Sequence, residues 1–259
     1  MVKKLHGEHP AYIWNGVFST WDDACKAAKT VGGDGHGGEP WLQRITQQIL
    51  DYRSEFKQYG IAMPPRPSNL PLVCAMTAPS AIVDFGGASG WCWDYLQNTL
   101  PDQRISSYVV VEIDEVVNYM KKTGIHTAPV AYQSLKDRLA PCDLLYCNSV
   151  LQYFGSNEPL VSLIERTAPQ HVFLEEVVAK GKDDFFTLQS RRDSLIPYRF
   201  LGLRKLLQEL SCAGYEEVIQ YPYASPILGI IQPLDMSNFP EEKRLRYASS
   251  ILLQKTKTQ

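Results

Sequence analysis

Residues 82–91, with the sequence Ile-Val-Asp-Phe-Gly-Gly-Ala-Ser-Gly-Trp, carry the residue types best suited to holding a ligand. An apolar run leads directly into a glycine-rich turn, and a helical pattern follows the turn. Glycine lets a backbone approach a ligand where a Cβ would clash, and the amides at a helix N-terminus favour an anionic group. The segment therefore predicts a loop that binds an anion such as an amino-acid carboxylate.

A second carboxylate, Glu112, ends the next apolar run at 108–112. It follows Gly86 at close to the ~20-residue offset at which an acidic side chain binds ribose hydroxyls in dinucleotide-binding folds. A nicotinamide-binding turn needs glycine at each fixed position of G-x-G-x-x-G, and Ala88 and Trp91 occupy two of those positions. A nicotinamide-dependent oxidoreductase is thus the less favoured alternative. The other alternative is that the glycines form a purely structural turn and that Glu112 is a solvated residue at the end of its strand.

Three residues are candidates for catalysis. His36 lies in a glycine-rich stretch at 31–40 that could close as a lid, and we predict it as the general base; a solvated loop histidine is the alternative. Tyr153 follows a strand at the expected ligand edge, where it either orients an acceptor or packs in the core. Glu175, paired with Glu176, ends another strand and either binds an acceptor hydroxyl or belongs to a surface pair.

Basic and aromatic residues between 174 and 203 form the predicted acceptor site. Arginine recognises carboxylate or phosphate in a bidentate manner, so these residues favour an anionic acceptor; a solvated helix face is the alternative. The predicted acceptor-binding residues are Arg191, Arg192, Tyr198 and Arg199.

Apolar runs alternate with helical patterns from residue 81 onward, which is typical of a parallel sheet covered on both faces. Two further strands, 215–221 and 247–253, have no helix between them and predict an antiparallel pair at the sheet edge. We therefore expect an α/β, Rossmann-like, seven-stranded mixed sheet, with five parallel strands and that edge pair. The five parallel strands are expected at 81–85, 108–112, 127–132, 142–147 and 171–174.

The N-terminal part of the chain has a different character. Helical patterns at 21–30 and 41–59 flank the glycine-rich stretch, so residues 1–70 are predicted to form a helical cap or lid on a domain of residues 71–259. His126 and His171 fall at strand starts and are expected to face solvent.

The composition narrows the class of partner. The 259 residues include 26 basic and 28 acidic side chains, for a net charge of −2, which argues against a nucleic-acid substrate. The six cysteines form no C-x-x-C pair and lie at no metal-ligand spacing from a histidine, so we expect a reducing compartment and no metal. No apolar run approaches membrane-spanning length, and we expect a cytoplasmic protein that acts on a small molecule or sugar. The oligomeric state is open.

The segment 84–90 resembles the first motif of class I S-adenosylmethionine-dependent methyltransferases, with Ala88 in place of the middle glycine. Residues 111–112 and 142–154 are similar to later motifs of the same class. More narrowly, residues 14–21 and 149–153 resemble a little-characterised family of methyltransferase-like proteins that often occur alongside bacterial surface-polysaccharide functions.

The resemblance implies a methyltransferase with S-adenosylmethionine as cofactor. Together with the arginines, it leads us to expect methylation of an oxygen on a small or carbohydrate-like, anionic acceptor. It places glycines at the methionine end, Glu112 on the ribose, Ile113 against adenine, residues 132–134 near the adenine amino group, and 148–149 beside the sulfonium. The implied cofactor-binding residues are Asp84, Gly86, Gly87, Gly90, Glu112, Ile113, Ser134, Asn148 and Ser149. A non-catalytic, nucleotide-binding relative is the main alternative.

Overall fold

A seven-stranded sheet forms the centre of the computed structural model, which describes residues 13–29, 38–191, 194–223, 226–227, 230–231 and 234–256. Neighbouring strands follow the order β4-β3-β2-β5-β6-β12-β9. The first five are parallel, and β12 runs antiparallel to both β6 and β9, so the predicted sheet is confirmed. The strands are β2 (Ala81–Phe85), β3 (Ser107–Glu112), β4 (Val130–Ser134), β5 (Leu144–Asn148), β6 (His171–Val177), β9 (Tyr215–Tyr223) and β12 (Ala248–Lys255).

Several strand boundaries differ from the predicted ones, and two of the differences have a clear physical cause. β4 begins at Val130 rather than 127, directly after Pro129, which has no backbone N–H to donate to a ladder. β6 continues to Val177 rather than ending at 174, because Glu175 still pairs with Asn148 of β5. The carboxylates predicted to follow this strand are therefore part of it.

Helices cover both faces of the sheet, because neighbouring residues of a strand point to opposite faces. Ile82 packs among side chains of four helices, α2 to α5, while Val83 packs among those of α6 and α7. The helices are α2 (Glu39–Tyr59), α3 (Leu70–Thr77), α4 (Trp91–Thr99), α5 (Asp114–Thr123), α6 (Glu158–Thr167) and α7 (Leu203–Cys212). The result is a three-layered α/β/α arrangement.

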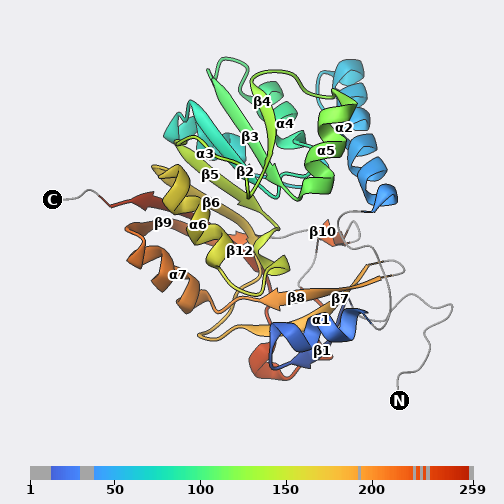
Figure 1. Cartoon of the computed structure of the whole chain (residues 1–259), viewed down its shortest axis with the longest axis vertical. Coiled ribbons are helices and arrows are strands. Elements are labelled where there is room, and N and C mark those ends of the chain that lie inside the picture. The colour runs from blue at the N-terminus through green and yellow to red at the C-terminus, as the bar shows by residue number, and fades with distance from the viewer. Residues whose placement is uncertain are drawn as a thin grey trace.

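A second sheet was not predicted. Strand β1 (Trp14–Phe18) pairs with β7 (Phe185–Arg191), which pairs with β8 (Ser194–Phe200), and α1 (Trp21–Lys29) packs beside them. Figure 1 shows these elements gathered at one end of the molecule, below the large sheet. The N-terminal segment is thus helical in α1 to α3 but contributes a strand as well. Its short β1 finds its partner more than 160 residues later, a pairing that no local pattern reveals.

The remaining described elements are short. They are the two-stranded ladder of β10 (Pro226–Ile227) and β11 (Ile230–Ile231), and the 3-10 turns η1 (Leu151–Tyr153) and η2 (Glu241–Lys243). Within the described ranges, no helix has both the length and the apolar character needed to cross a membrane.

Candidate functional site

Three non-glycine residues with left-handed backbones lie at the carboxyl edge of the large sheet. They are Ala88 after β2 (φ 52°), Ser149 after β5 (φ 56°) and Glu176 within β6 (φ 52°). Such conformations cost free energy and tend to cluster at functional sites. These three strands are neighbours, and the carboxyl edge is where open α/β sheets bind ligands. The edge is therefore the candidate site.

The glycine loop after β2 has the conformation that its sequence predicts. Gly86 (φ 75°) and Gly90 (φ 74°) both adopt the left-handed conformation. A Cβ on Gly86 would lie 2.4 Å from Cγ2 of Val150, and one on Gly87 would lie 2.3 Å from Oδ2 of Asp84. In this structure the glycines are thus required by the close approach of protein atoms, on either side of the loop.

Glu112 joins the end of β3 to this loop. One carboxylate oxygen accepts a hydrogen bond from the backbone N–H of Ala88 (3.1 Å), and the other accepts one from Ile113 (3.1 Å). Burial raises the pKa of Glu112, although these two hydrogen bonds oppose the shift. Ile113 beside it is 43% exposed, which leaves an apolar surface next to the carboxylate.

Asp84 lies beneath the loop and is only 1% exposed. Its Oδ2 accepts a hydrogen bond from the Tyr108 hydroxyl (2.7 Å). Burial raises the pKa of Asp84 to about 7, the Tyr108 hydrogen bond opposes this, and the nearby Glu112 adds to it. Because the side chain is enclosed, we assign Asp84 to supporting the loop rather than to touching a ligand.

Two buried polar atoms at this edge have no hydrogen-bond partner among the described residues, namely Oδ1 of Asn148 and Oγ of Ser89. The amide nitrogen of Asn148 is engaged, since it donates to the Tyr146 hydroxyl (2.9 Å). Buried polar atoms without a partner are costly, so each calls for an explanation such as a bound group. A hydrogen-bond donor of a bound ligand would satisfy each of them.

Ser134 and Ser149 are placed by contacts of their own. Ser134 is buried at the end of β4, beside Glu112 in the ladder, and its backbone N–H donates to Oδ2 of Asp137 (2.7 Å). Ser149 follows β5, and its hydroxyl accepts from Nε2 of Gln152 (2.8 Å). The structure therefore gathers the predicted cofactor-binding residues along one sheet edge, while their contact with a ligand remains a prediction.

Glu175 does not have the environment expected of a catalytic carboxylate. It is 2% exposed and accepts hydrogen bonds from Ser68 Oγ (2.7 Å), Asn69 N (2.7 Å) and Tyr146 Oη (2.7 Å). Burial raises its pKa, and these donors oppose the shift. Two protein donors on each oxygen, with Asn69 N and Nδ2 on Oε1 and Ser68 and Tyr146 on Oε2, leave no lone pair for a ligand. Glu175 therefore fastens the segment before α3 to the sheet and is not placed to act in catalysis.

Its neighbour Glu176 points elsewhere because of a bulge, since β6 has an additional residue opposite β12 at this point. Glu176 pairs with Nη1 of Arg66 at 3.3 Å. Burial acts to lower the pKa of Arg66, but Glu176 and three tyrosines (Tyr153, Tyr198 and Tyr223) outweigh it and raise the pKa. The Arg66 side chain is still 43% exposed. The sequence analysis missed Arg66, because a single arginine among prolines is typical of a linker.

The predicted acceptor residues separate into two groups. Tyr153 and Tyr198 come together, with ring centroids 5.7 Å apart, and the Tyr153 hydroxyl donates to Oε1 of Gln189 (3.1 Å). Arg199 is fully buried, donates to Oδ1 of Asn157 (2.6 Å) and lies 3.6 Å from Asp184, so it is an internal ion-pair residue and is unable to reach an acceptor.

Other predicted positions lie outside the described residues. They are His36, Arg192 and the side chain of Arg191, of which only the backbone is described, at the end of β7. The expectation that His126 faces solvent is wrong, because its side chain is only 3% exposed. Among the described residues, no group of three or more His, Cys, Asp or Glu side chains is arranged to hold a metal ion.

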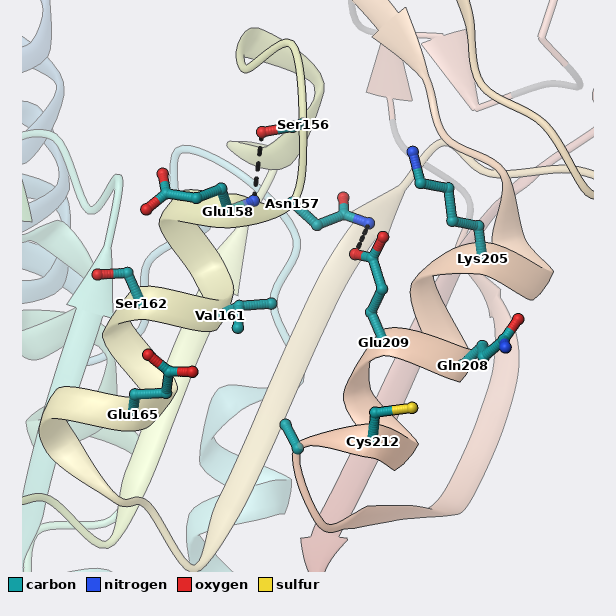
Figure 2. Close-up of a pocket in the computed structure, with 11 residues that line it drawn as sticks. Ser156, Asn157, Glu158, Val161, Ser162, Glu165, Lys205, Gln208, Glu209 and Cys212 are labelled. Atoms are coloured by element: carbon teal, nitrogen blue, oxygen red, sulfur yellow. Dashed lines mark hydrogen bonds between the residues drawn. The ribbon is translucent and has the colours of Figure 1, made fainter.

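A groove of about 810 Å³ lies away from this edge, between α6 and α7. Figure 2 shows acidic side chains on both of its walls, with Glu158 and Glu165 on α6 and Glu209 on α7. Asn157 bridges the groove by donating to Oε2 of Glu209 (2.8 Å). None of the predicted cofactor-binding residues lines it, so it is distinct from the candidate site.

Comparison with solved structures identifies the architecture. Human N-acetylserotonin methyltransferase, solved with S-adenosylmethionine, superposes with a TM-score of 0.53 at 15% identity, covering 92% of this chain and 66% of that one. The fold is that of the class I methyltransferases.

A second solved structure supports the same fold. A chain from the complex of the Haloferax volcanii Trm112 methyltransferase activator with a methyltransferase candidate has a TM-score of 0.50 at 12% identity, covering 85% of this chain and 96% of that one. No protein-family model matches the chain, and no curated protein matches it. At such identities the likeness to this methyltransferase fold concerns architecture, so activity must be argued from the site.

Proposed function

We propose that the protein is an S-adenosylmethionine-dependent methyltransferase that methylates an oxygen of a small, anionic acceptor. The observation that carries this proposal is the junction of the glycine loop with Glu112, whose carboxylate lies against the loop backbone at 3.1 Å. A loop of this kind, an acidic residue at the end of the next strand, and two unsatisfied buried polar atoms suit a nucleoside with an amino-acid tail.

The residues present fit such a cofactor. The unpartnered Oδ1 of Asn148 would accept from the ammonium group of the amino-acid tail, and the amides of the loop would donate to its carboxylate. Glu112 would accept from the ribose hydroxyls, and Ile113 would cover one face of the adenine. Ser134, at the end of β4, would lie near the adenine amino group. When bound, the cofactor supplies an electrophilic methyl group.

The acceptor is proposed to bind beside β6, between Arg66 and the Tyr153–Tyr198 pair. Arg66 is half-exposed and carries a charge that a carboxylate or phosphate would complement. The aromatic side chains offer a surface for a sugar ring, in keeping with the resemblance to proteins associated with surface polysaccharides. Residues 1–70 would then act as a cap on the domain of residues 71–259, because Arg66 belongs to them.

The chemistry asked of this chain is mainly orientation, since methyl transfer is an in-line displacement. A carboxylate or phosphate oxygen needs no general base, whereas a hydroxyl generally does. His36 remains the proposed base for a hydroxyl acceptor. If the variant His36→Ala keeps full turnover at every pH, the acceptor is one that needs no base or the base is another residue.

Calorimetry with S-adenosylhomocysteine tests the cofactor site. We expect binding by the wild type and at least about tenfold weaker binding by Glu112→Ala, because two backbone amides lose their acceptor and the ribose loses its partner. Equal affinity in the two proteins would reject the site. Formation of S-adenosylhomocysteine in equal amount with a methylated acceptor would establish the enzyme, whereas binding without turnover on any acceptor would support the non-catalytic alternative.

A further inference from the structure

A chain of hydrogen bonds leads from helix α2 to the glycine loop. Arg53 donates from Nε to Oδ1 of Asp94 (2.5 Å) and from Nη2 to Oδ2 (3.1 Å). Asp94 Oδ2 contacts Nε2 of His126 (2.6 Å), and Nδ1 of His126 contacts the Tyr132 hydroxyl (2.7 Å). The Tyr132 hydroxyl donates to the backbone carbonyl of Ser89 (2.7 Å). The four side chains thus form one hydrogen-bonded chain, which ends on the backbone oxygen of Ser89 in the glycine loop.

Counting the hydrogen-bond donors and acceptors along this chain shows which ring nitrogens of His126 must carry a proton. Asp94, with its pKa lowered against burial by its bonds to His126 and Arg53, is an acceptor, so Nε2 of His126 donates to it. The carbonyl of Ser89 only accepts, so the single hydroxyl proton of Tyr132 goes to it. The Tyr132 oxygen must then accept from Nδ1. All contacts are satisfied together only when both ring nitrogens carry a proton.

The His126 ring lies against the loop itself. A Cβ on Gly90 would meet Tyr132 Oη at 3.1 Å and His126 Cε1 at 3.3 Å. Exposed fractions are 3% for the His126 side chain and 14% for Asp94. The charged and titratable groups facing the ring are Arg53 from α2, Asp94 from α4 and Tyr132 from β4, with Asp84 of β2 acting on Tyr132. The loop therefore rests on an enclosed group of hydrogen-bonded polar and charged side chains.

We propose that His126 is a positioning residue that, as an imidazolium, holds the glycine loop in its cofactor-binding shape through Tyr132. Without a proton on Nδ1, the Tyr132 hydroxyl would turn toward the ring and the Ser89 carbonyl would lose its donor. The loop would then loosen, and the affinity for the cofactor would fall. The effect on affinity rests on the proposed function, whereas the charge on His126 and the anchoring of the loop do not.

Two measurements on the ligand-free protein test the anchor directly. In ¹⁵N NMR at neutral pH, both ring nitrogens of His126 should show imidazolium shifts, and a neutral tautomer would overturn the proposal. In the variant Tyr132→Phe, loop amides at 86–91 should exchange with solvent about five- to tenfold faster, since one buried hydrogen bond is lost. Unchanged exchange in the loop would equally overturn it.

Tyr215→Phe is the matched control, because the buried Tyr215 hydroxyl also donates to a backbone carbonyl, that of Pro169 (2.6 Å), at the opposite edge of the sheet. It should leave exchange at 86–91 unchanged. A similar increase in both variants would mean that Tyr132 contributes general stability, which contradicts the proposal.

The affinity for S-adenosylhomocysteine at neutral pH tests the consequence for the cofactor. The dissociation constant of Tyr132→Phe should be about five- to tenfold larger than that of the wild type, while that of Tyr215→Phe should equal it. Equal dissociation constants for Tyr132→Phe and the wild type would overturn the proposed effect on cofactor affinity. If the wild type shows no binding at all, the proposed function fails, while the NMR and exchange results still decide the anchor.

Discussion

The two halves of the candidate site are built in different ways. The cofactor half, at the ends of β2, β3, β4 and β5, comes from consecutive βα units within residues 84–149, and its central contact joins residues only 24 positions apart. The acceptor half, formed by Arg66, Tyr153, Glu176 and Tyr198, draws on four distant segments. One half is fixed mainly by local backbone geometry, the other by long-range packing.

This difference predicts which amino-acid substitutions each half would tolerate. Glycines with left-handed backbones leave the cofactor half little freedom for a side chain, so single substitutions there should be severe. The acceptor half depends on the packing of the small sheet against the large one, so substitutions of its buried residues should reduce stability. Substitutions of its exposed residues should affect only the binding of the acceptor.

The largest effect is expected for Gly86→Val. The new side chain would meet Val150, whose Cγ2 would lie 2.4 Å from the Cβ, on a backbone with φ 75° that β-branched residues avoid. We expect at least a thousandfold loss of affinity for S-adenosylhomocysteine, equivalent to about 4 kcal/mol, measured by calorimetry on protein shown by circular dichroism to be folded.

Gly124→Ala separates the clash from backbone strain alone. Gly124 has a similar φ of 60°, but no neighbouring atom lies within 4 Å of the added Cβ. This control should lose about 1–2 kcal/mol of stability and keep its affinity. Affinity within threefold of the wild type for Gly86→Val would mean that the loop does not form the cofactor half.

Asp184→Ala should be the most destabilising change on the acceptor side. It leaves the fully buried Arg199 without its ionic partner at 3.6 Å and removes the acceptor of the Gly202 N–H (2.8 Å). We expect a loss of about 3 kcal/mol in the free energy of unfolding, measured in urea, with little change in cofactor affinity. Lys205→Ala, which removes the half-exposed partner of Asp184, should cost less than ~1 kcal/mol. Equal losses of unfolding free energy in the two variants would show that the buried Arg199–Asp184 pair contributes little to stability.

Asp84→Asn should change how stability depends on pH. The pKa of Asp84 is raised to about 7 from 3.8, so ionisation opposes folding. The wild type keeps its full stability below pH ~4 and loses part of it as pH rises through 7. Asparagine is unable to ionise and still accepts from Tyr108, so its advantage over the wild type should grow to on the order of 4 kcal/mol by pH 8. If the unfolding free energies of the wild type and Asp84→Asn differed by the same amount at every pH from 4 to 8, ionisation of Asp84 would not oppose folding.

The smallest expected effect is that of Arg66→Gln. Loss of the charge should raise the KM for the methyl acceptor found by product analysis about tenfold and leave the dissociation constant of S-adenosylhomocysteine unchanged. Arg104→Gln, at an exposed position before the amino end of β3, is the charge-matched control and should change neither. A rise in both constants, or in neither, would show that Arg66 does not distinguish the two halves.

The amino-acid sequence by itself determined the large sheet and the residues of the proposed cofactor half. The alternation of apolar strands with amphipathic helices predicts a parallel sheet, and a glycine turn between strand and helix has few possible conformations. The positions of Gly86, Gly90 and Glu112 follow from those local rules, and only strand ends, such as those of β4 and β6, needed correction.

Tertiary structure alone decided the acceptor half and the surroundings of the histidine. β1 pairs with β7 across most of the chain, and a bulge in β6 directs Glu175 to one side and Glu176 toward Arg66. Arg199 and His126 look like surface residues in the sequence, yet the side chains of both are buried, where each pairs with a carboxylate from another segment, Asp184 and Asp94 respectively. Burial and pairing of this kind depend on which segments meet in space, and a side chain's neighbours in the chain do not specify that.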